Sequence, residues 1–201
     1  AIWTGFNSIR FDEEMLRQAF YQNLQPDIFA TQFNGNTRFD LLTALYAVWN
    51  RQPDLFEWPV DETGRVRFKL DLIAPLNGFA AHIAHDALGD VEATIHIARQ
   101  IAQRAPALWA ELLANRDKAR LQARIETFEP MALIERFGGG SPRATLGCFC
   151  GYSASNPNQA AFFDLEAADP ADFLTADDAT LFAAVDATPK VIRSLSINKT
   201  P

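Results

Sequence analysis

The hydrophobic periodicity of the chain changes near Phe128, and this change most constrains the folds open to it. Up to about residue 125, apolar residues recur at intervals of three and four, which is typical of amphipathic helices. A Gly-rich break at residues 138–142 then precedes the runs ATLGCFCGY, QAAFFDLEA and VIRSLSIN, which are typical of strands. The sequence therefore predicts a mixed α/β (α+β) fold, with an α-rich part before a smaller β-rich part.

Within this frame the pattern predicts individual elements. AIWTGF is expected to be a strand, residues 10–23 a helix, and DLLTALYAVWN a second helix with Asp40 as its N-cap. A long helix should follow Asp86, with Leu88, Val91, Ile95, Ala98 and Ala102 on its apolar stripe. One more helix is expected over ALWAELLANRDKARLQARI, and Thr175 should open a short helix through a capping box.

The charge of the chain is unevenly distributed. Residues 164–186 contain seven carboxylates and no Lys or Arg. The charge of this stretch alone equals the net charge of the whole chain, −7. Residues 99–124 carry a local charge of +4, so this stretch could attract a polyanion or could be an ordinary solvated helical face. No apolar run approaches the roughly 20 residues of a membrane span. With only Cys148 and Cys150, expected as small buried residues on one face of a strand, we predict a reducing, cytoplasmic location.

All three histidines lie in or at the edge of HIAHDALGDVEATIHIA, residues 82–98. If Asp86 caps the following helix, His85 precedes the helix and Asp90 lies one turn inside it. Both side chains can then reach one point, which suits a general base beside a metal ligand. A zinc site built from His82, His85 and His96 is the competing interpretation, although H-E-x-x-H is absent. The third interpretation is an ordinary helix that carries histidines without a metal or acid–base role.

A second group of acidic residues lies in GFNSIRFDEE, residues 5–14. Asp12 to Glu14 at the start of a helix could simply complement the helix dipole. Together, however, G-F-N-S-I-R-F-D-E-E and H-D-A-L-G-D-V-E-A-T closely resemble the exodeoxyribonuclease I family of the DEDD superfamily. N-G-N-T-R-F-D-L-L, E-W-P, F-K-L, L-N-G-F, R-D-K and I-N-K-T-P fit that family in order and spacing, so the resemblance extends over essentially the whole chain.

The resemblance implies an RNase H-like 3′→5′ exonuclease domain over residues 1–105 and an SH3-like DNA-clamping barrel over residues 106–201. It implies degradation of single-stranded DNA to 5′-mononucleotides in DNA repair and recombination, with two Mg²⁺ ions for which Mn²⁺ can substitute. It assigns Asp12 and Asp90 as metal ligands and His85 as the general base that activates water. Lys69 and, more weakly, Arg17 match substrate-binding positions, and single-strand DNA-binding protein is an expected partner.

The chain departs from the family in two respects, the first D-x-E motif and the C-terminal helical domain. The family's first D-x-E motif lies well upstream of G-F-N-S-I-R-F-D, and only six residues precede Asn7 here. Asp164-Leu165-Glu166 resembles such a motif but lies in the expected barrel. The chain opens without an initiator methionine, so we expect a piece of a longer protein that lacks this motif and the family's C-terminal helical domain. Two carboxylates should bind Mg²⁺ weakly, and the piece alone should be inactive.

Other classes of function remain open from the sequence. The chain could be a non-catalytic module that only binds single-stranded nucleic acid, through residues such as Lys69 and through stacking on Phe33, Phe39 or Trp49. It could belong to the same superfamily and act on RNA, although the barrel after residue 106 argues against this. An α/β protein without any role on nucleic acid is the remaining alternative.

Overall fold

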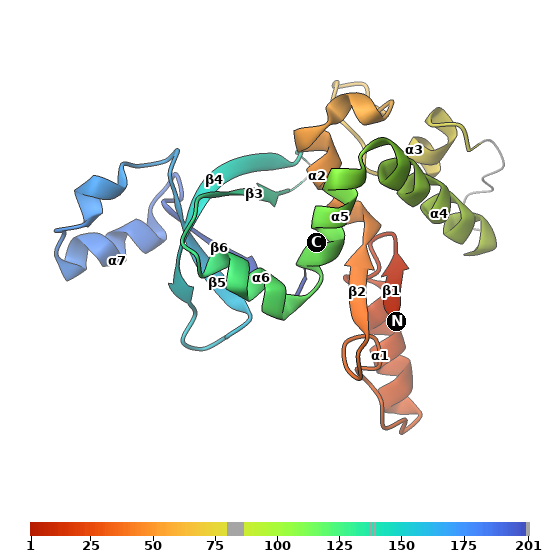
Figure 1. Ribbon diagram of the computed structural model, residues 1–201, viewed down its shortest axis with the longest axis horizontal. Coiled ribbons are helices and arrows are strands. Elements are labelled where there is room, and N and C mark those ends of the chain that lie inside the picture. The colour runs from red at the N-terminus through yellow and green to blue at the C-terminus, as the bar shows by residue number, and fades with distance from the viewer. Residues whose placement is uncertain (80–86, 137, 139, 200–201) are drawn as a thin grey trace. The chain divides into compact units, whose positions relative to one another are not determined.

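The computed structural model describes residues 1–79, 87–136, 138 and 140–199, and we refer to these as the described residues (Figure 1). By its internal contacts the chain divides into two compact units, which are described separately. The first unit contains Ala1–Asp117 and the short segment Arg136–Pro142, and the second contains Lys118–Glu135 and Arg143–Lys199. The expected boundary between independently folding domains, after residue 105, stays a prediction. No described helix is long and apolar enough to cross a membrane.

The first unit begins with two parallel strands. β1 (Ile2–Gly5) pairs with β2 (Thr37–Asp40), and helix α1 (Asp12–Gln22) lies between them in sequence. β1 and α1 agree with the sequence-based prediction. β2 does not, because Pro, Gly and Asn fill the preceding segment and only four residues form the strand, too few to show an alternating pattern.

Helix α2 (Leu41–Arg51) carries the core of the first unit. Its side chains at Leu41, Ala44, Leu45 and Val48 are completely buried, as the spacing of three and four predicts. The expected N-cap is confirmed, since the Asp40 carboxylate accepts a hydrogen bond of 3.0 Å from the backbone N–H of Leu42.

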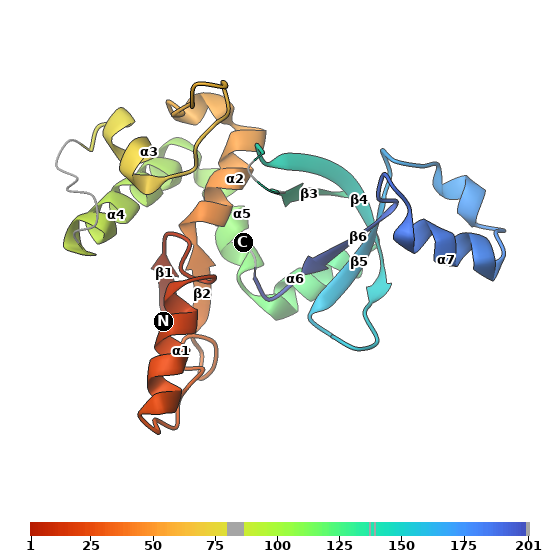
Figure 2. The same ribbon diagram turned by 180° about the vertical axis from the view of Figure 1, so that it is seen from behind.

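The remaining helices of this unit are η1 (Pro53–Leu55), α3 (Leu70–Leu76), α4 (Ala87–Arg104) and α5 (Pro106–Asn115). α3 packs against α4, which Figure 2 shows from behind. The apolar stripe expected on α4 is wrong: Leu88, Val91 and Ile95 are exposed, and the buried residues are Gly89, Ala93, Thr94, Ile97 and Ile101. The buried positions still recur every three to four residues, but on a different face of the helix, because the packing of α4 against α3 and α5 decides which face is covered.

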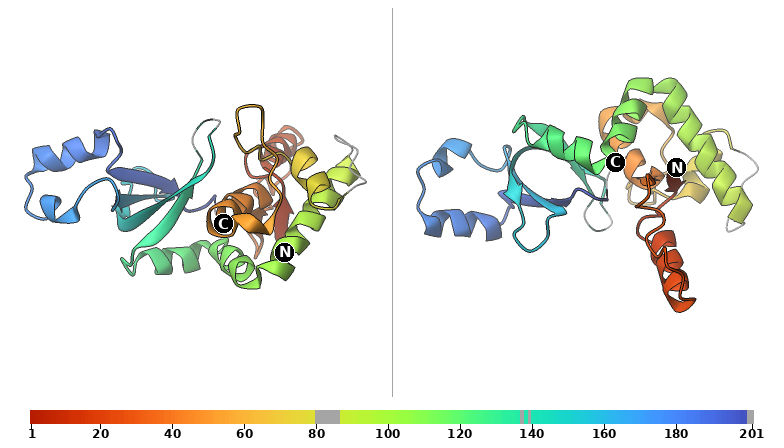
Figure 3. Two further views of the ribbon diagram at one scale, coloured as in Figure 1. Left: turned by 90° about the horizontal axis from the view of Figure 1, so that it is seen from above. Right: turned by 60° about the horizontal axis from the view of Figure 1, so that its bottom comes forward.

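The second unit is a curled antiparallel sheet with one helix against it (Figure 3). The strands β3 (Met131–Glu135), β4 (Arg143–Tyr152), β5 (Gln159–Asp164) and β6 (Ile192–Ser196) lie in that order. Leu121 and Ile125 of α6 (Lys118–Ile125) join Leu133, Phe149 and Phe162 in the core. This confirms the predicted change from helices to strands, while the RNase H-like and SH3-like assignments stay expectations.

Three local predictions in this region are wrong. The single helix expected after Pro106 is interrupted at residues 116–117, so α5 and α6 are separate helices. The short helix α7 (Asp178–Asp186) is capped by Asp177 rather than Thr175. The carboxylate of Asp177 accepts a hydrogen bond of 2.9 Å from the backbone N–H of Thr180. Cys148 is only half-buried and Cys150 is exposed, because both point away from the sheet's buried face, where Phe149 lies.

Candidate functional site

Three consecutive carboxylates open helix α1, and the structure gives each a different environment. Glu13 is buried and contacts Arg38 at 2.8 Å and the Thr31 hydroxyl at 3.3 Å. Glu14 forms a surface ion pair of 2.6 Å with Arg17. Asp12 is exposed, and its carboxylate forms no hydrogen bond or ion pair with any other residue that the structure describes. Of the three, Asp12 is therefore the carboxylate that remains available to a ligand.

The turn that leads into α1 is held by Asp40. One carboxylate oxygen of Asp40 accepts from the Asn7 N–H at 2.8 Å, and the other accepts from the Ile9 N–H at 3.1 Å. Burial raises the pKa of Asp40, although these N–H donors oppose the shift. Asn7 adopts a φ of 60°, a left-handed conformation that asparagine tolerates better than most residues. A carboxylate at the end of β2 thus fixes the backbone that sets the start of α1, and with it Asp12.

Asp90, the second predicted metal ligand, lies in the first turn of α4 and is half-buried. Its backbone carbonyl accepts a hydrogen bond of 2.8 Å from the Thr94 hydroxyl. Asp12 and Asp90 therefore both lie in the first turn of a helix of the first unit, where the helix dipole favours negative charge. Carboxylate oxygens are the ligands that Mg²⁺ prefers, so the donor type fits this ion.

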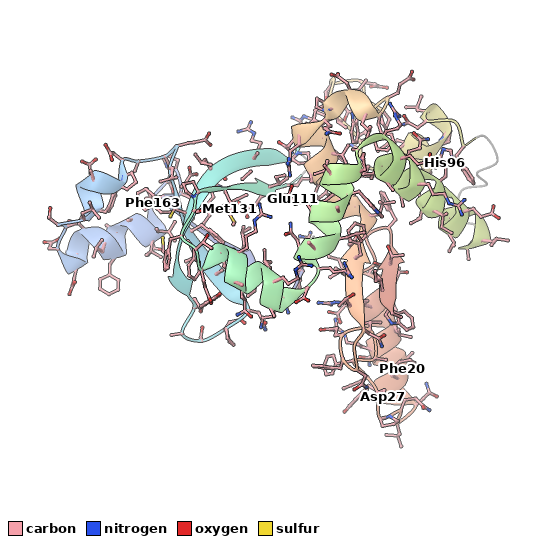
Figure 4. All side chains as sticks on the ribbon, in the orientation of Figure 1. Phe20, Asp27, His96, Glu111, Met131 and Phe163 are labelled. Atoms are coloured by element: carbon pink, nitrogen blue, oxygen red, sulfur yellow. The ribbon has the colours of Figure 1, made fainter. Side chains whose placement is uncertain are left out.

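The described residues do not complete a metal site. Within the described residues, no three His, Cys, Asp or Glu side chains lie close enough together to hold a metal ion. The predicted general base His85, its neighbour Asp86 and the alternative ligand His82 lie outside the described residues, so their predicted roles stay predictions. His96, marked in Figure 4, is half-buried, and its ring Nε2 lies 2.8 Å from the carbonyl oxygen of Asn77, in the turn after α3.

The two predicted substrate-binding cations differ in environment. Lys69 is exposed and immediately precedes α3, and its side-chain ammonium forms no hydrogen bond or ion pair with another described residue. Arg17 is already paired with Glu14, and its guanidinium lies 5.8 Å from the centre of the Phe29 ring. Lys69 can therefore bind a phosphate without first losing another contact, whereas Arg17 would share its charge with Glu14.

An exposed aromatic pair follows α1. The rings of Phe29 and Phe33 meet edge to face with centres 6.0 Å apart, and Phe33 is 60% exposed. Figure 4 marks Phe20 and Asp27 in the same part of the first unit, at the end of α1 and in the loop after it. Residues 26–30 with Phe33 and Asn34 line a shallow hollow beside the pair. Phe33 was among the predicted stacking residues, whereas Phe29 was missed, although the spacing of four between two exposed loop aromatics was visible in QPDIFATQF.

The other two predicted stacking residues pack against aromatic rings of the first unit. Phe39 is 2% exposed and packs against Trp109, so it belongs to the core. Trp49 is half-buried and packs edge to face against Trp58 and Phe68. Phe33 is thus the candidate that the structure keeps accessible.

Asp164, the first residue of the D-x-E string in the second unit, is held in a structural ion pair. It is 2% exposed, and its carboxylate lies 2.6 Å from Nε of Arg193. Glu135 lies 3.5 Å from the same guanidinium, so two carboxylates share one cation. Burial, assisted by the charge of Asp164, raises the pKa of Glu135 above its ordinary value.

This shift gives a pH prediction. Between the ordinary pKa of Glu135 and its raised folded value, the folded protein keeps a proton that the unfolded chain has lost, so the free energy of unfolding falls as pH rises through this window. Glu135→Gln should therefore stabilise the second unit at pH 7 and leave it nearly unchanged near pH 4. Hydrogen exchange of the β3–β6 amides measures this, with the exposed Glu129→Gln as the control. Equal protection in Glu135→Gln and wild type at pH 7 would contradict it.

Comparison with solved structures defines the class of protein to which this fold corresponds. The chain superposes over 98% of its length on the crystal structure of Escherichia coli exonuclease I in complex with a dA16 oligonucleotide, with a TM-score of 0.78 and 29% identity. It matches a moderately thermophilic exonuclease I from Methylocaldum szegediense with a TM-score of 0.79. In each case it covers 44% of the other chain. The fold is therefore that of a part of an exonuclease.

Curated sequences show to which proteins the chain is similar. The chain is 35% identical to exodeoxyribonuclease I of Haemophilus influenzae and 34% identical to that of Escherichia coli, in both cases over 134 residues. The aligned region covers 67% of this chain and 28% of each relative. No family model matches the sequence. The chain is homologous to a part of exodeoxyribonuclease I, as the motifs around Asp12 and Asp90 predicted.

Proposed function

We propose that this protein is a 3′→5′ exodeoxyribonuclease that hydrolyses single-stranded DNA to 5′-mononucleotides and acts in DNA repair and recombination. The observation that carries the proposal is the environment of Asp12. Its two acidic neighbours are paired with Arg38 and Arg17, whereas the exposed carboxylate of Asp12 has no ion-pair partner among the described residues. This is the position that matches a catalytic carboxylate in the homologous family, and a solvent-exposed acid without a structural partner is suited to bind a cation.

In this mechanism Asp12 and Asp90 would hold Mg²⁺, for which Mn²⁺ can substitute. When bound, two such ions would polarise the scissile phosphate and stabilise the leaving 3′-oxygen. His85 takes the proton from the attacking water, a role that suits a side chain that titrates near neutral pH. Asp40 contributes indirectly, since it fixes the turn that positions Asp12. Lys69 binds a backbone phosphate of the DNA strand, with Arg17 as a weaker contact.

The exposed aromatic pair supports single-stranded DNA as the substrate. A base stacked on an aromatic ring contributes about 1–3 kcal/mol, and stacking requires a base that is not paired in a duplex. Phe33→Ala should therefore weaken binding of a fluorescein-labelled oligo-dT in EDTA by about tenfold, measured by anisotropy. Phe182 is 75% exposed and lies in the acidic part of the second unit, so Phe182→Ala should leave the affinity unchanged. Equal effects of both substitutions would contradict a stacking role for Phe33.

The decisive test is a gel assay on a 3′-overhang oligonucleotide with Mg²⁺, with wild type beside His85→Ala. Release of mononucleotides that His85→Ala abolishes supports the proposed enzyme and its general base. Release that His85→Ala leaves unchanged would contradict the role of His85.

A second candidate function is binding of single-stranded DNA without cleavage. The observation in its favour is that the described residues contain no group of three metal-ligating side chains. In the gel assay, a shifted oligonucleotide that stays intact would support this alternative. Single-strand DNA-binding protein is a proposed partner under both functions, because one structural neighbour, with a TM-score of 0.75, is an ExoI/SSB-Ct complex.

A further inference from the structure

A short helical segment of the second unit, between β5 and β6, differs from the rest of the chain in composition. We call residues 169–186 the acidic lobe; it contains η2 (Pro170–Phe173) and α7, at the blue end of the ribbon in Figure 1. It has five carboxylates and no Lys or Arg. Asp169 and Asp177 cap η2 and α7 through backbone N–H groups. The carboxylates of Asp172, Asp178 and Asp186 are exposed and form no hydrogen bond or ion pair with another described residue, so their charges face solvent.

The acidic lobe also exposes large apolar side chains. Leu174 is 82% exposed, Phe182 75%, Val185 50% and Leu181 42%, and Ala184 is the buried residue of α7. A helix of nine residues is marginal in water unless an apolar face packs against something. Here the residues that would form that face lie in solvent. Exposed apolar groups of this size within a polar rim are typical of interaction sites.

The apolar and acidic groups of α7 form one surface. Val185 follows Phe182 by three residues and Leu181 by four, so its side chain is a neighbour of both on the same side of the helix. Asp178 precedes this apolar group along the helix and Asp186 follows it. A segment that lies along α7 would therefore meet an apolar strip with a carboxylate at each end.

We propose that this surface of the acidic lobe binds a Lys/Arg-rich amphipathic segment of a partner protein. Apolar anchors of that segment would cover Phe182 and Leu181, and its cations would pair with Asp178 and Asp186. The negative charge of the lobe favours a positively charged partner over the alternatives. The five carboxylates of the lobe repel DNA and anionic membranes, and the contact from Lys190 to the carbonyl of Val185 leaves the lobe with a net negative charge. A two-fold pairing of two copies through this surface would place like charges opposite each other.

The proposal does not depend on the proposed nuclease function, and its test uses no nucleic acid. The probe is a synthetic 18-residue Leu/Lys amphipathic peptide, titrated into the 201-residue chain by calorimetry, beside a peptide with Glu in place of Lys. We expect saturable binding of the Leu/Lys peptide and none of the Leu/Glu peptide. Phe182→Ser should weaken binding by at least about tenfold, because exposed aromatic residues often act as anchors. Since Phe182 is 75% exposed, the variant should fold normally, which circular dichroism verifies.

Non-specific attraction between an acidic protein and a cationic peptide is controlled by charge-matched variants. Asp172→Asn/Asp178→Asn/Asp186→Asn removes three carboxylates from the lobe, and Asp54→Asn/Glu62→Gln/Glu129→Gln removes three exposed carboxylates elsewhere. We expect a marked loss of affinity for the first and little change for the second. Equal losses in both, or unchanged binding by Phe182→Ser, would overturn the proposal. So would a concentration-dependent dimer, seen by sedimentation without peptide, that Phe182→Ser dissociates, since the occupant would then be a second copy.

Discussion

Asp90→Asn and Asp12→Asn are each expected to lower the rate of Mg²⁺-dependent mononucleotide release from single-stranded DNA by about 10³-fold. A metal ion at a phosphoryl group supplies several kcal/mol of transition-state stabilisation, and each 1.36 kcal/mol is a factor of ten in rate. An amide keeps the size of the carboxylate but lacks its charge, so the fold should be preserved while the ion is bound less well. The measurement is the gel assay at saturating Mg²⁺, with binding of the oligonucleotide in EDTA as a parallel readout.

Each substitution has a matched control on the same helix. Glu92 is exposed two residues after Asp90 and has no hydrogen bond or ion pair with another described residue, so Glu92→Gln should keep nearly full activity. Glu14→Gln removes only the surface ion pair with Arg17, which is worth less than about 1 kcal/mol. If the two aspartate variants cleave as fast as these controls, Asp12 and Asp90 are not metal ligands. A loss of binding in EDTA, equal to the loss of cleavage, would point instead to a disturbed fold.

The elements of this fold that could be predicted from the sequence are those with a clear local signal. α1 and α2 follow from their spacing of apolar residues, and the Asp40 cap follows from the residue type before the helix. β2 could not be predicted, since its four residues are stabilised by pairing with β1, which lies far away in the sequence. The buried face of α4 depends on the approach of α3, which local periodicity does not contain.

In the candidate site, too, some features could be predicted from local sequence and others depend on tertiary contacts. The motif around Asp12 predicted which carboxylates matter, but not that Arg38 would bury and neutralise Glu13. That pairing joins α1 to β2 across a sequence separation of 25 residues, and no spacing rule indicates it. Phe29 was missed for a related reason, because its exposure depends on how the loop after α1 folds back. Residue types predicted the chemistry, whereas tertiary contacts decide which side chains are available for it.

Asp40→Ala is expected to lower the free energy of unfolding of the first unit by about 3 kcal/mol. The Asp40 carboxylate accepts from the N–H groups of Asn7, Ile9 and Leu42, and alanine would leave all three without this acceptor. A buried donor that loses its partner costs about 1–3 kcal/mol, and loss of a helix N-cap about 1 kcal/mol. Tryptophan fluorescence in urea isolates this unit, because Trp3, Trp49, Trp58 and Trp109 all lie within it. The exposed Asp54→Ala should change the stability by less than about 0.5 kcal/mol.

Asp40→Asn changes the hydrogen-bonding groups of the side chain but keeps its size, so it tests the hydrogen bonds alone. Its amide oxygen can still accept from Asn7 and Leu42, but the amide nitrogen would then face the Ile9 N–H, so two donors would oppose each other. We therefore expect a loss of stability smaller than that of Asp40→Ala, together with a displaced turn at Asn7–Ile9. Because this turn leads directly into Asp12, Asp40→Asn should lower the cleavage rate even where the protein is fully folded. Full activity in a destabilised Asp40→Asn protein would show that the turn does not position Asp12.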